Sequence, residues 1–314
     1  LGEGYTTDDN ARALLYLSLL PEGARDEGLV RTYLAFLLHM QKEDGRFRNG
    51  LTLDGRFEDE GEAEDPTGRA VLALAAAQRL PPPYAGPARE ALLRALPALE
   101  GFTSLRGRAY ALLGLLALPK EPFLEAAEAL GEGLLRAFRE AEPAWPYPGP
   151  LTYANHRPVE ALYAYGLAFR RQEAVALARR ALAFLKEHYF TPGEEGLFFD
   201  PVGNRFMARG RDKPLFDQQP IEAKCALLAH LRFGERVLAE VAFLWFHGRN
   251  RLRAPLVDAF GPMDGLTPHG PNQNRGAEAL LAYLLAWQAL VQGVFPQVDE
   301  GVALGRVFAL GGRP

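Results

Sequence analysis

The chain has 314 residues, of which 48% are hydrophobic and 24% are charged, and its formal net charge is −4. This composition is typical of a soluble globular protein with a sizeable core, and it excludes a disordered, collagen-like or disulfide-built chain. The weak negative charge indicates no nucleic-acid partner. A single cysteine, Cys225, excludes an internal disulfide and a cysteine-rich metal site.

The N-terminus and the apolar runs predict a cytoplasmic protein without membrane contact. Residues 1–10 lack the basic and apolar regions of a signal peptide, although a start at Leu1 leaves room for a missing N-terminal segment. The longest uncharged run, 279–298, contains Gln288, Gln292 and Pro296, so we interpret it as a buried helix rather than a membrane span. The lone cysteine fits a reducing compartment. The preference for arginine over lysine indicates a thermophile.

Along the chain, one pattern recurs six times: polar residues, a small residue or proline, a charged residue, and then a long run of Ala and Leu. The charged members are Arg12, Arg69, Arg108, Glu160, Glu222 and Glu278. Each copy opens a helix that is apolar nearly all round, such as 109–118 or 279–290, and such a helix must be buried on every side. Helices with one charged face are predicted between the copies, at 27–42, 87–99, 122–140, 173–188 and 235–246.

Six buried helices that alternate with five half-exposed ones have a simple packing solution. The buried set forms an inner ring and the amphipathic set an outer ring, which makes an all-α, (α/α)6 toroid with one domain over residues 1–314. A sixth outer helix is not evident after Gln292, and a segment missing before Leu1 could supply it.

Two stretches break the helical period and predict short β-hairpins on one rim. Residues 45–57 alternate apolar and polar side chains around Asp54-Gly55, a strong hairpin signal. Residues 197–207 are similar, with Gly203-Asn204 at the expected turn. The segment 249–271 has little helical pattern, and long irregular segments of compact domains often carry function.

In such a ring, the inner-helix N-termini and the loops before them share one mouth, so the six polar clusters are expected to meet in one cavity. Carboxylates and amides there suit sugar hydroxyls, and aromatic rings suit the C–H face of a pyranose. The predicted catalytic carboxylates are Asp9 and Asp217, with Glu222 in reserve. The predicted substrate-binding residues are Tyr5, Asp8, Asn10, Arg12, Trp145, Tyr147, Tyr153, Asn155, Glu160, Gln218, His269, Asn274 and Glu278.

Structural roles compete with these assignments. Asp65 and Asp9 suit helix N-caps, and Glu160 and Glu222 suit the capping-box position after a first-turn proline. Ion pairs with neighbouring carboxylates are the favoured role of the arginines at positions 12, 69 and 108. The acidic run 58–64, which includes Asp59 and Glu60, is typical of a solvated loop.

The histidines fall into two groups, and Cys225 is expected in the core. His39, His188, His230 and His247 lie on helical faces and suit packing, whereas His156 and His269 are expected in rim loops. No metal-ligand spacing, nucleophile elbow or phosphate-binding loop is present. We therefore expect no metal and no cofactor.

The motif GYTTDDNARAL at residues 4–14 resembles a poorly characterised bacterial family of six-hairpin, glycosidase-like proteins, often found within or beside glycosyltransferases. Supporting motifs stand at 151–155, 216–223 and 272–278, so the resemblance covers nearly the whole chain. It implies an (α/α)6 barrel, a carbohydrate ligand and a glycosyltransferase partner. Ala154 departs from the pattern, because an acidic residue is expected between Tyr153 and Asn155.

Three functions stay open at this point. The first is inverting hydrolysis of a glycoside or oligosaccharide, in which Asp9 and Asp217 would lie about 6.5–9.5 Å apart. The second is a non-catalytic sugar-binding or scaffolding module that serves a glycosyltransferase, which Ala154 favours. The third is a sugar epimerase or isomerase that uses a pair of bases, for which His156 and His269 are candidates.

Overall fold

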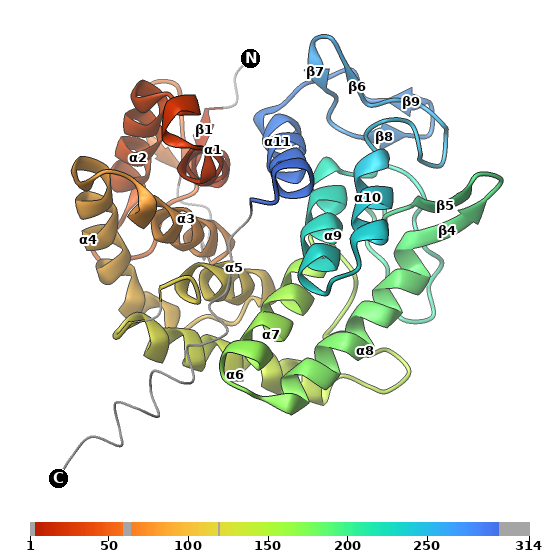
Figure 1. Cartoon of the computed structure of the whole chain (residues 1–314), viewed down its shortest axis with the longest axis horizontal. Coiled ribbons are helices and arrows are strands. Elements are labelled where there is room, and N and C mark those ends of the chain that lie inside the picture. Colours follow the sequence, from red (N-terminus) through yellow and green to blue (C-terminus); the bar gives the residue numbers. More distant parts are fainter. Residues whose placement is uncertain (1–3, 59–63, 119, 295–314) are drawn as a thin grey trace. The chain divides into compact units, whose positions relative to one another are not determined.

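The computed structural model describes residues 4–58, 64–118 and 120–294. Its contacts separate into two compact units. Unit 1 contains the described residues of 1–134 together with 164–175, and unit 2 contains 135–163 together with 176–294. Three helices contribute residues to both units. Figure 1 labels the helices and strands.

Unit 1 is built from helices that pack in sequence order, together with one small sheet. Its elements are β1 (Tyr5–Thr6), α1 (Thr7–Leu19), α2 (Glu27–Met40), β2 (Gly50–Leu51), β3 (Phe57–Glu58), α3 (Glu64–Ala76), α4 (Pro82–Leu99), α5 (Leu105–Leu115) and the first part of α6 (Phe123–Glu140). Helix α3 packs against α1 and α5, and α2 packs against α1 and α4. The three strands form one antiparallel sheet in the order β1-β2-β3.

Unit 2 combines helices with three two-stranded ribbons. Its elements are most of α7 (His156–Ala168) and α8 (Gln172–Tyr189), then β4 (Phe190–Gly193), β5 (Gly196–Phe199), α9 (Pro220–Arg232), α10 (Arg236–Leu244), β6 (Val257–Asp258), β7 (Gly261–Pro262), β8 (Leu266–Thr267), β9 (Gly270–Pro271) and α11 (Ala277–Gln292). Helix α9 packs against both α10 and α11. The ribbons pair β4 with β5, β6 with β7, and β8 with β9.

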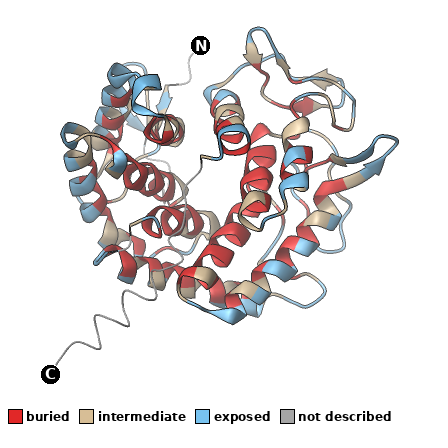
Figure 2. Ribbon diagram, viewed as in Figure 1, coloured by how far each residue is buried: buried red, intermediate tan, exposed pale blue. Residues whose placement is uncertain are grey.

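Buried and half-exposed helices alternate along the chain, as the sequence predicts. Helices α3, α5 and α9 are buried along nearly their whole length, whereas α2 and α4 bury one face only (Figure 2). Cys225 is fully buried in α9, which confirms its expected place in the core. None of the helices in the described residues has both the length and the apolar character needed to cross a bilayer.

The first predicted hairpin is confirmed and the second is displaced. Strands β2 and β3 pair antiparallel around the turn at Asp54-Gly55. The second hairpin pairs Phe190 with Phe199 and turns at residues 194–195, so the hairpin predicted around Gly203-Asn204 is wrong. The chain does turn there, because the amide of Phe206 donates to the carbonyl oxygen of Gly203 at 3.3 Å. Beyond Phe199 the amide of Asp200 donates to the carbonyl oxygen of Tyr189 at 2.7 Å, and the next residue, Pro201, has no N–H to continue the pairing.

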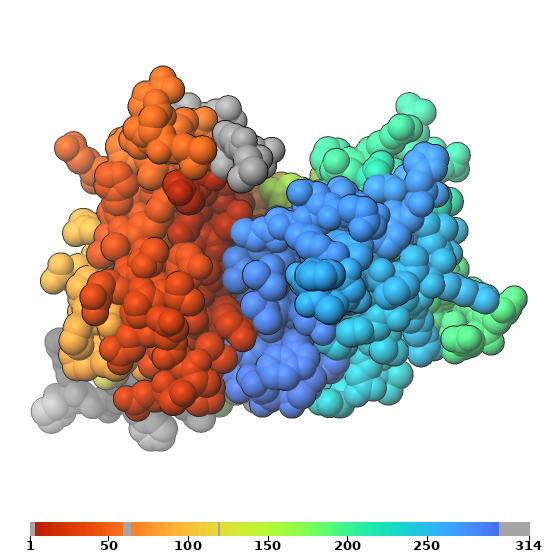
Figure 3. All heavy atoms as spheres, turned by 90° about the horizontal axis from the view of Figure 1, so that it is seen from above, coloured from red at the N-terminus to blue at the C-terminus, as the bar shows by residue number. Residues whose placement is uncertain are grey.

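The segment 249–271 contains no helix within the described residues, which agrees with its lack of helical pattern. It forms the ribbons β6–β7 and β8–β9, and its chain leads directly into α11. These residues and α11, coloured blue, make up much of the face of unit 2 seen in Figure 3. The segment is therefore a surface layer of unit 2 that ends at the N-terminus of α11.

Candidate functional site

The N-terminus of α1 in unit 1 is closed by its own polar residues. Thr6 is the N-cap, because its side chain accepts from the amide of Asp9, so the prediction of Asp9 as the cap is wrong. The Asp9 carboxylate accepts from the Thr6 hydroxyl at 3.0 Å and pairs with Arg12 at 2.6 Å. The Asn10 amide donates to the Thr6 carbonyl oxygen at 2.7 Å.

A second carboxylate joins the arginines of two neighbouring helices. Asp8 lies 3.2 Å from the guanidinium of Arg69 and 4.0 Å from that of Arg12, and both arginines are buried. The ion pairs expected for Arg12 and Arg69 are therefore confirmed. Tyr5, with 54% of its surface exposed, is the most open of the predicted sugar contacts in this cluster, and it makes an edge contact with Phe36.

Of the two described residues of the acidic run, Glu58 is exposed as predicted, whereas Glu64 has a structural role. Glu64 is buried and accepts from the backbone amides of Thr103 and Ser104 at 2.8 and 2.5 Å. Asp65 lies inside α3 rather than ahead of it, so it is not the N-cap, and it pairs with Arg106 at 2.7 Å. Asp59 and Glu60 lie outside the described residues.

In unit 2, the N-terminal ends of α7 and α9 share a buried polar cluster. Glu222 of α9 accepts from the backbone amide of Ala154, so the predicted capping box within α9 is wrong. Ala154 has φ of 52°, in the left-handed region, and packs with Tyr153, Ile221 and Cys225. The missing acidic side chain of the sequence pattern is thus replaced by a backbone contact to another carboxylate.

Asn155 connects this cluster to the end of α8. Its amide donates to the hydroxyl of Tyr189 at 2.7 Å, and its oxygen accepts from the amide of Thr152 at 2.9 Å. Burial, and then the Glu222 carboxylate, raise the pKa of Tyr189 well above its usual value. Asn155 is buried, so its contacts favour a supporting role over direct sugar contact.

His156 is the first residue of α7 and is fully buried, not in a rim loop as predicted. Its ring lies edge-on to Tyr189 at 4.8 Å and 5.7 Å from the ring of His230. Neither ring nitrogen has a hydrogen-bond partner among the described residues. Burial, and then His230, lower the pKa of His156 well below 6.5, so the ring stays neutral. His269, in contrast, is exposed in the β8–β9 turn.

Glu160 is held between two arginines. It pairs with Arg157 at 2.5 Å and with Arg232 at 3.0 Å, and all three side chains are buried. Burial alone would raise the pKa of Glu160, but the two positive charges outweigh it and hold the pKa below its usual value. This arrangement is an ion triad between α7 and α9, rather than the predicted capping box.

Asp217, just ahead of α9, is arranged differently from these carboxylates. It is exposed, and among the described residues its carboxylate has no hydrogen-bond or ion-pair partner. Its φ of 60° lies in the left-handed region, where Gly, Asn and Asp are the residues that fit best. A strained backbone of this kind persists only where the surrounding structure imposes it.

The backbone on both sides of Asp217 is fixed by close contacts. A Cβ at Gly203 would lie 1.8 Å from the carbonyl oxygen of Phe216, so only glycine allows this approach. Beyond Asp217, the backbone of Gln218 exchanges two hydrogen bonds with Leu266, of 3.1 and 3.0 Å. A Cβ at Gly265 would lie 2.3 Å from the carbonyl oxygen of Gln218. These contacts fix the backbone from which the Asp217 side chain extends.

The side chain of Gln218 adds a second restraint. Its amide donates to Asp200 and to the Leu215 carbonyl oxygen, both at 2.9 Å, and its oxygen accepts from Trp245 at 2.8 Å. Since both ends of this buried amide bond to the protein, Gln218 suits support of Asp217 better than the predicted substrate contact.

Asp200 is the centre of this support. It is fully buried and pairs with Arg251 at 2.6 Å and with Lys213 at 2.8 Å. Burial alone would raise the pKa of Asp200, but Arg251 and Lys213 outweigh it and hold the pKa below 3.8. One carboxylate thus connects the chain after β5, the loop before α9 and the segment after α10.

The N-terminus of α11 is closed like that of α1. Asp264 accepts from the backbone amide of Gly276 at 2.5 Å and from the side chain of Asn274. Glu278 lies in the first turn of α11 and is partly exposed. The carboxamide of Asn274, predicted to bind substrate, is therefore bonded to Asp264.

The aromatic residues predicted to stack on sugar differ in exposure. Tyr147 is buried and makes an edge contact with Phe138, so its ring is packed rather than presented. Tyr153 is partly exposed, as is Trp145, whose indole contacts the rings of Phe184 and His188.

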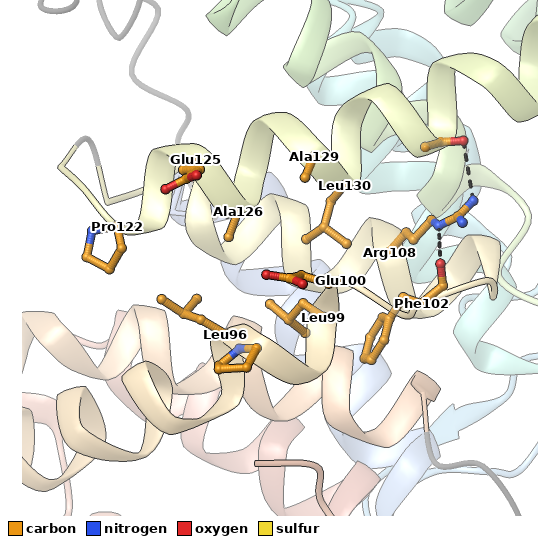
Figure 4. Close-up of a pocket in the computed structure, with 12 residues that line it drawn as sticks. Leu96, Leu99, Glu100, Phe102, Arg108, Pro122, Glu125, Ala126, Ala129 and Leu130 are labelled. Carbon is orange, nitrogen blue, oxygen red and sulfur yellow. Dashed lines mark hydrogen bonds between the residues drawn. The ribbon is translucent and has the colours of Figure 1, made fainter. Parts of the chain in front are cut away.

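A hollow of about 350 Å³ in unit 1 lies between α4 and α6 (Figure 4). Leu96, Leu99, Phe102 and Leu130 make its lining mainly apolar. Arg108 lies at one end and donates to the carbonyl oxygens of Phe102 and Gly133. The hollow therefore suits a saccharide less well than the polar clusters do. Among the described residues, no group of three or more His, Cys, Asp or Glu side chains could hold a metal ion.

Sequence reasoning missed the residues that hold Asp217. Asp200, Lys213, Arg251 and Trp245 belong to no repeated motif, and their pairing spans up to 51 residues. The one local signal is the position of Asp200 between a buried Phe199 and Pro201, where a lone carboxylate needs a partner.

Comparison with known proteins gives matches at the level of structure. No family model matches the chain, and a search of curated proteins also finds no match. A D-mannose isomerase structure has a TM-score of 0.65 at 10% identity, over 92% of this chain and 87% of that one. Cellobiose 2-epimerase from Bacillus thermoamylovorans B4167 has a TM-score of 0.65 at 9% identity, over 91% and 88%.

A GH76 α-mannanase from Bacteroides thetaiotaomicron is also similar, with a TM-score of 0.60 at 10% identity, over 93% of this chain and 87% of that one. These structural neighbours are six-hairpin, glycosidase-like enzymes. At such low identity the likeness shows the fold alone. The chain has the (α/α)6 toroid fold, with short antiparallel strand pairs, that the sequence predicts.

Proposed function

We propose that this protein is a carbohydrate-active enzyme that acts on a glycoside or oligosaccharide, with Asp217 as a catalytic carboxylate. One observation carries the proposal: an exposed, unpaired carboxylate stands on a left-handed backbone that buried contacts hold in place. Strain maintained in this way is typical of functional residues.

The proposed reaction is inverting hydrolysis. In that mechanism one carboxyl group protonates the leaving oxygen and a second activates water, about 6.5–9.5 Å from the first. Asp217 is the proposed first member of the pair and Asp9 the proposed second. They belong to different units, so their pairing remains a prediction. Glu222 is a weaker candidate, because it is buried and bonded to the Ala154 amide.

The comparisons support a carbohydrate substrate without choosing the reaction. Two of the similar structures carry the names of a sugar isomerase and a sugar epimerase, and the third carries that of a mannanase. All three names denote action on carbohydrates.

A substrate screen with product analysis tests the proposal. The protein is incubated with glycosides and oligosaccharides, and NMR distinguishes cleavage from isomerisation and records the anomer released. We expect Asp217→Asn to abolish turnover and to retain sugar binding. Asp212→Asn, at an exposed carboxylate five residues earlier, is the matched control. Unchanged turnover in Asp217→Asn would remove Asp217 from the mechanism.

Epimerisation or isomerisation is the second candidate, because two of the similar structures carry the names of a sugar isomerase and a sugar epimerase. Its candidate bases, His156 and His230, are both fully buried. His156 was predicted to work with His269, but it lies beside His230, and both rings carry nitrogens without partners among the described residues. Neutral imidazoles can exchange a proton with a sugar carbon. A reaction in D2O separates the two functions: epimerisation places deuterium at the reacting carbon, and hydrolysis does not. His156→Gln should abolish only the former.

The third candidate, a sugar-binding module that serves a glycosyltransferase, is supported by Ala154 alone. Binding without any turnover, together with co-purification of a glycosyltransferase from the source organism, would favour it. The cytoplasmic location and thermophilic source are also predictions.

A further inference from the structure

A second hollow, in unit 2, has the chemistry of a saccharide site. It encloses about 500 Å³ between the C-terminal end of α6, the loop that follows and residues 208–209. Its lining combines rings with charges, and the residues used below are Glu140, Glu142, Trp145, Pro148, Pro150 and Arg209. We call it the Trp145 groove.

Trp145 is fixed within this groove. Its indole nitrogen donates to the carbonyl oxygen of Gly149 at 2.8 Å, which closes the short loop between them. The ring also packs edge-on against Phe184 at 4.8 Å and against His188 at 6.0 Å. A preorganised aromatic ring loses little conformational freedom when a ligand packs on it.

The frame of the groove is also fixed. Leu151 and Met207 exchange two backbone hydrogen bonds of 2.8 Å, which join the loop after α6 to the segment that carries Arg209. Pro148 and Pro150 restrict the backbone between Trp145 and this bridge. The Leu151 side leads within three residues to Ala154, at the start of the buried cluster described above.

The charges on the rim select the class of ligand. Arg209 pairs with Glu142, and both side chains are more than half exposed, so they can bond to hydroxyl groups from outside. Glu140 adds a second exposed carboxylate. Two carboxylates against one guanidinium give the rim a negative balance, which disfavours uronic or phosphorylated sugars.

We propose that the Trp145 groove binds a neutral hexose unit of an oligosaccharide, at a site separate from Asp217. The indole packs on the C–H face of the sugar ring, while Glu140, Glu142 and Arg209 bond to its hydroxyls. The inference rests on the proposed carbohydrate function for its ligand class, but it does not require Asp217 to be catalytic.

The test observes the groove directly. Protein labelled with 15N at tryptophan gives three indole signals, because the chain has three tryptophans, and Trp145→Phe assigns the signal of interest. Mannotriose and cellotriose are titrated separately. We expect the Trp145 signal to shift in a saturable way with at least one of them. The Trp245 indole, bonded to Gln218, reports binding near Asp217 separately, so a shift of the Trp145 signal alone identifies the groove.

Variants then measure how much the charged rim and the Trp145 ring each contribute to sugar binding. Arg209→Ala and Glu142→Gln change exposed side chains, so they should fold normally and weaken the Trp145 shift several-fold. Trp145→Ala should weaken binding by about tenfold in calorimetry, the scale of a lost ring contact. Phe260→Ala, which removes an aromatic ring that is 85% exposed elsewhere in unit 2, should leave binding unchanged.

The outcomes distinguish this inference from the proposed function. No shift of the Trp145 signal with either oligosaccharide overturns the inference, as does binding that Arg209→Ala, Glu142→Gln and Trp145→Ala all leave unchanged. If the groove binds sugar but Asp217→Asn retains full turnover, the catalytic role of Asp217 fails and the groove stands. If turnover depends on Asp217 and the groove variants bind normally, the groove alone fails.

Discussion

The N-terminal ends of α1 and α9 carry related acidic motifs but are built in opposite ways. At α1, the Asp9 carboxylate bonds to Thr6 and Arg12, so its partners lie within the same cluster. At α9, Asp217 has no such partner among the described residues, and the buried bonds are made by its neighbour Gln218.

The difference separates two uses of a carboxylate. A carboxylate that is paired with a buried arginine helps to hold the fold, and its loss leaves a buried charge without a partner. An exposed carboxylate on a restrained backbone adds little stability but is available to a ligand. The repeated motif therefore specifies a buried helix at each copy, while the local contacts decide whether the acid is structural or open.

The largest expected effect is the loss of turnover when Asp217, ahead of α9, is changed. Asp217→Asn should lower the rate by about 10²–10⁴-fold, the usual contribution of an acid or base catalyst. Its melting temperature should not change, because Asn also accepts the left-handed backbone. Steady-state kinetics and a thermal melt, with Asp212→Asn in parallel, measure both. Equal losses in the two variants would contradict the special position of Asp217.

The next largest effect is expected on stability, when Asp200 is removed from the buried contacts that support Asp217. Asp200→Ala leaves Arg251 and Lys213 without their buried partner, so the free energy of unfolding should fall by about 3–5 kcal/mol. Urea unfolding measures this loss. Asp212→Ala removes an exposed carboxylate for comparison, and its change in the free energy of unfolding should lie within the experimental error. If Asp200→Ala loses little free energy of unfolding, the backbone contacts at Gly203 and Gly265 hold Asp217 in place without the Asp200 ion pairs.

At α1, the loss of the Asp9 charge should lower stability, besides the loss of turnover that its proposed role as the second catalytic carboxylate predicts. Asp9→Asn keeps the shape of the side chain but removes its charge beside Arg12, whose side chain is only 5% exposed. We expect unfolding to become easier by about 1–2 kcal/mol, since one charge-assisted contact weakens at a partly exposed carboxylate. Comparing urea midpoints of Asp9→Asn and Asp217→Asn sharpens the contrast, and equal midpoints would remove it.

Acid should destabilise unit 2 in two steps. The pKa of His156 is lowered in the folded state, so the unfolded chain binds the proton first and stability falls as pH drops below 6.5. The pKa of Asp200 is lowered from 3.8, so its contribution is present above that value and is lost as pH falls below it. Urea midpoints across this range test both steps. Burial lowers the pKa of His230 and of His247 as well, so His156→Gln should reduce the upper step without removing it, and an unchanged upper step would contradict the contribution of His156.

The smallest expected effect concerns the strained backbone itself. Asp217→Gly relieves about 1 kcal/mol of left-handed strain but adds a similar entropy cost to folding. The free energy of unfolding should therefore change by less than about 1 kcal/mol. Asp217→Val should lose stability, because a β-branched residue fits this region poorly. A Val variant as stable as the parent would show that the backbone relaxes.

Most of the fold could be predicted because helices that bury one face, or all faces, carry apolar residues at a recognisable helical spacing. The expected helix at 122–140 is observed at Phe123–Glu140, and that at 173–188 at Gln172–Tyr189. Helix α4 begins at Pro82, five residues before the predicted start, since proline fits a first helical turn.

The candidate site was only partly predictable. Asp217 and Glu222 stand in a motif next to a helix start and could be picked out locally. The partners that decide their roles come from far along the chain, as Ala154 does for Glu222 and Arg251 for Asp200. Hydrogen bonds between distant segments leave no period, so the sequence could not distinguish a paired carboxylate from an open one.

The amide contact between Ala154 and Glu222 also limits how the acid that the resemblance implies at position 154 could be introduced. A carboxylate introduced at position 154 would enter a fully buried place beside one that is already there, and two such neighbours resist joint ionisation. A productive exchange would have to change both positions together. Positions 154 and 222 should therefore change together in evolution. Relatives with an acid at position 154 are expected to carry a compensating residue at position 222.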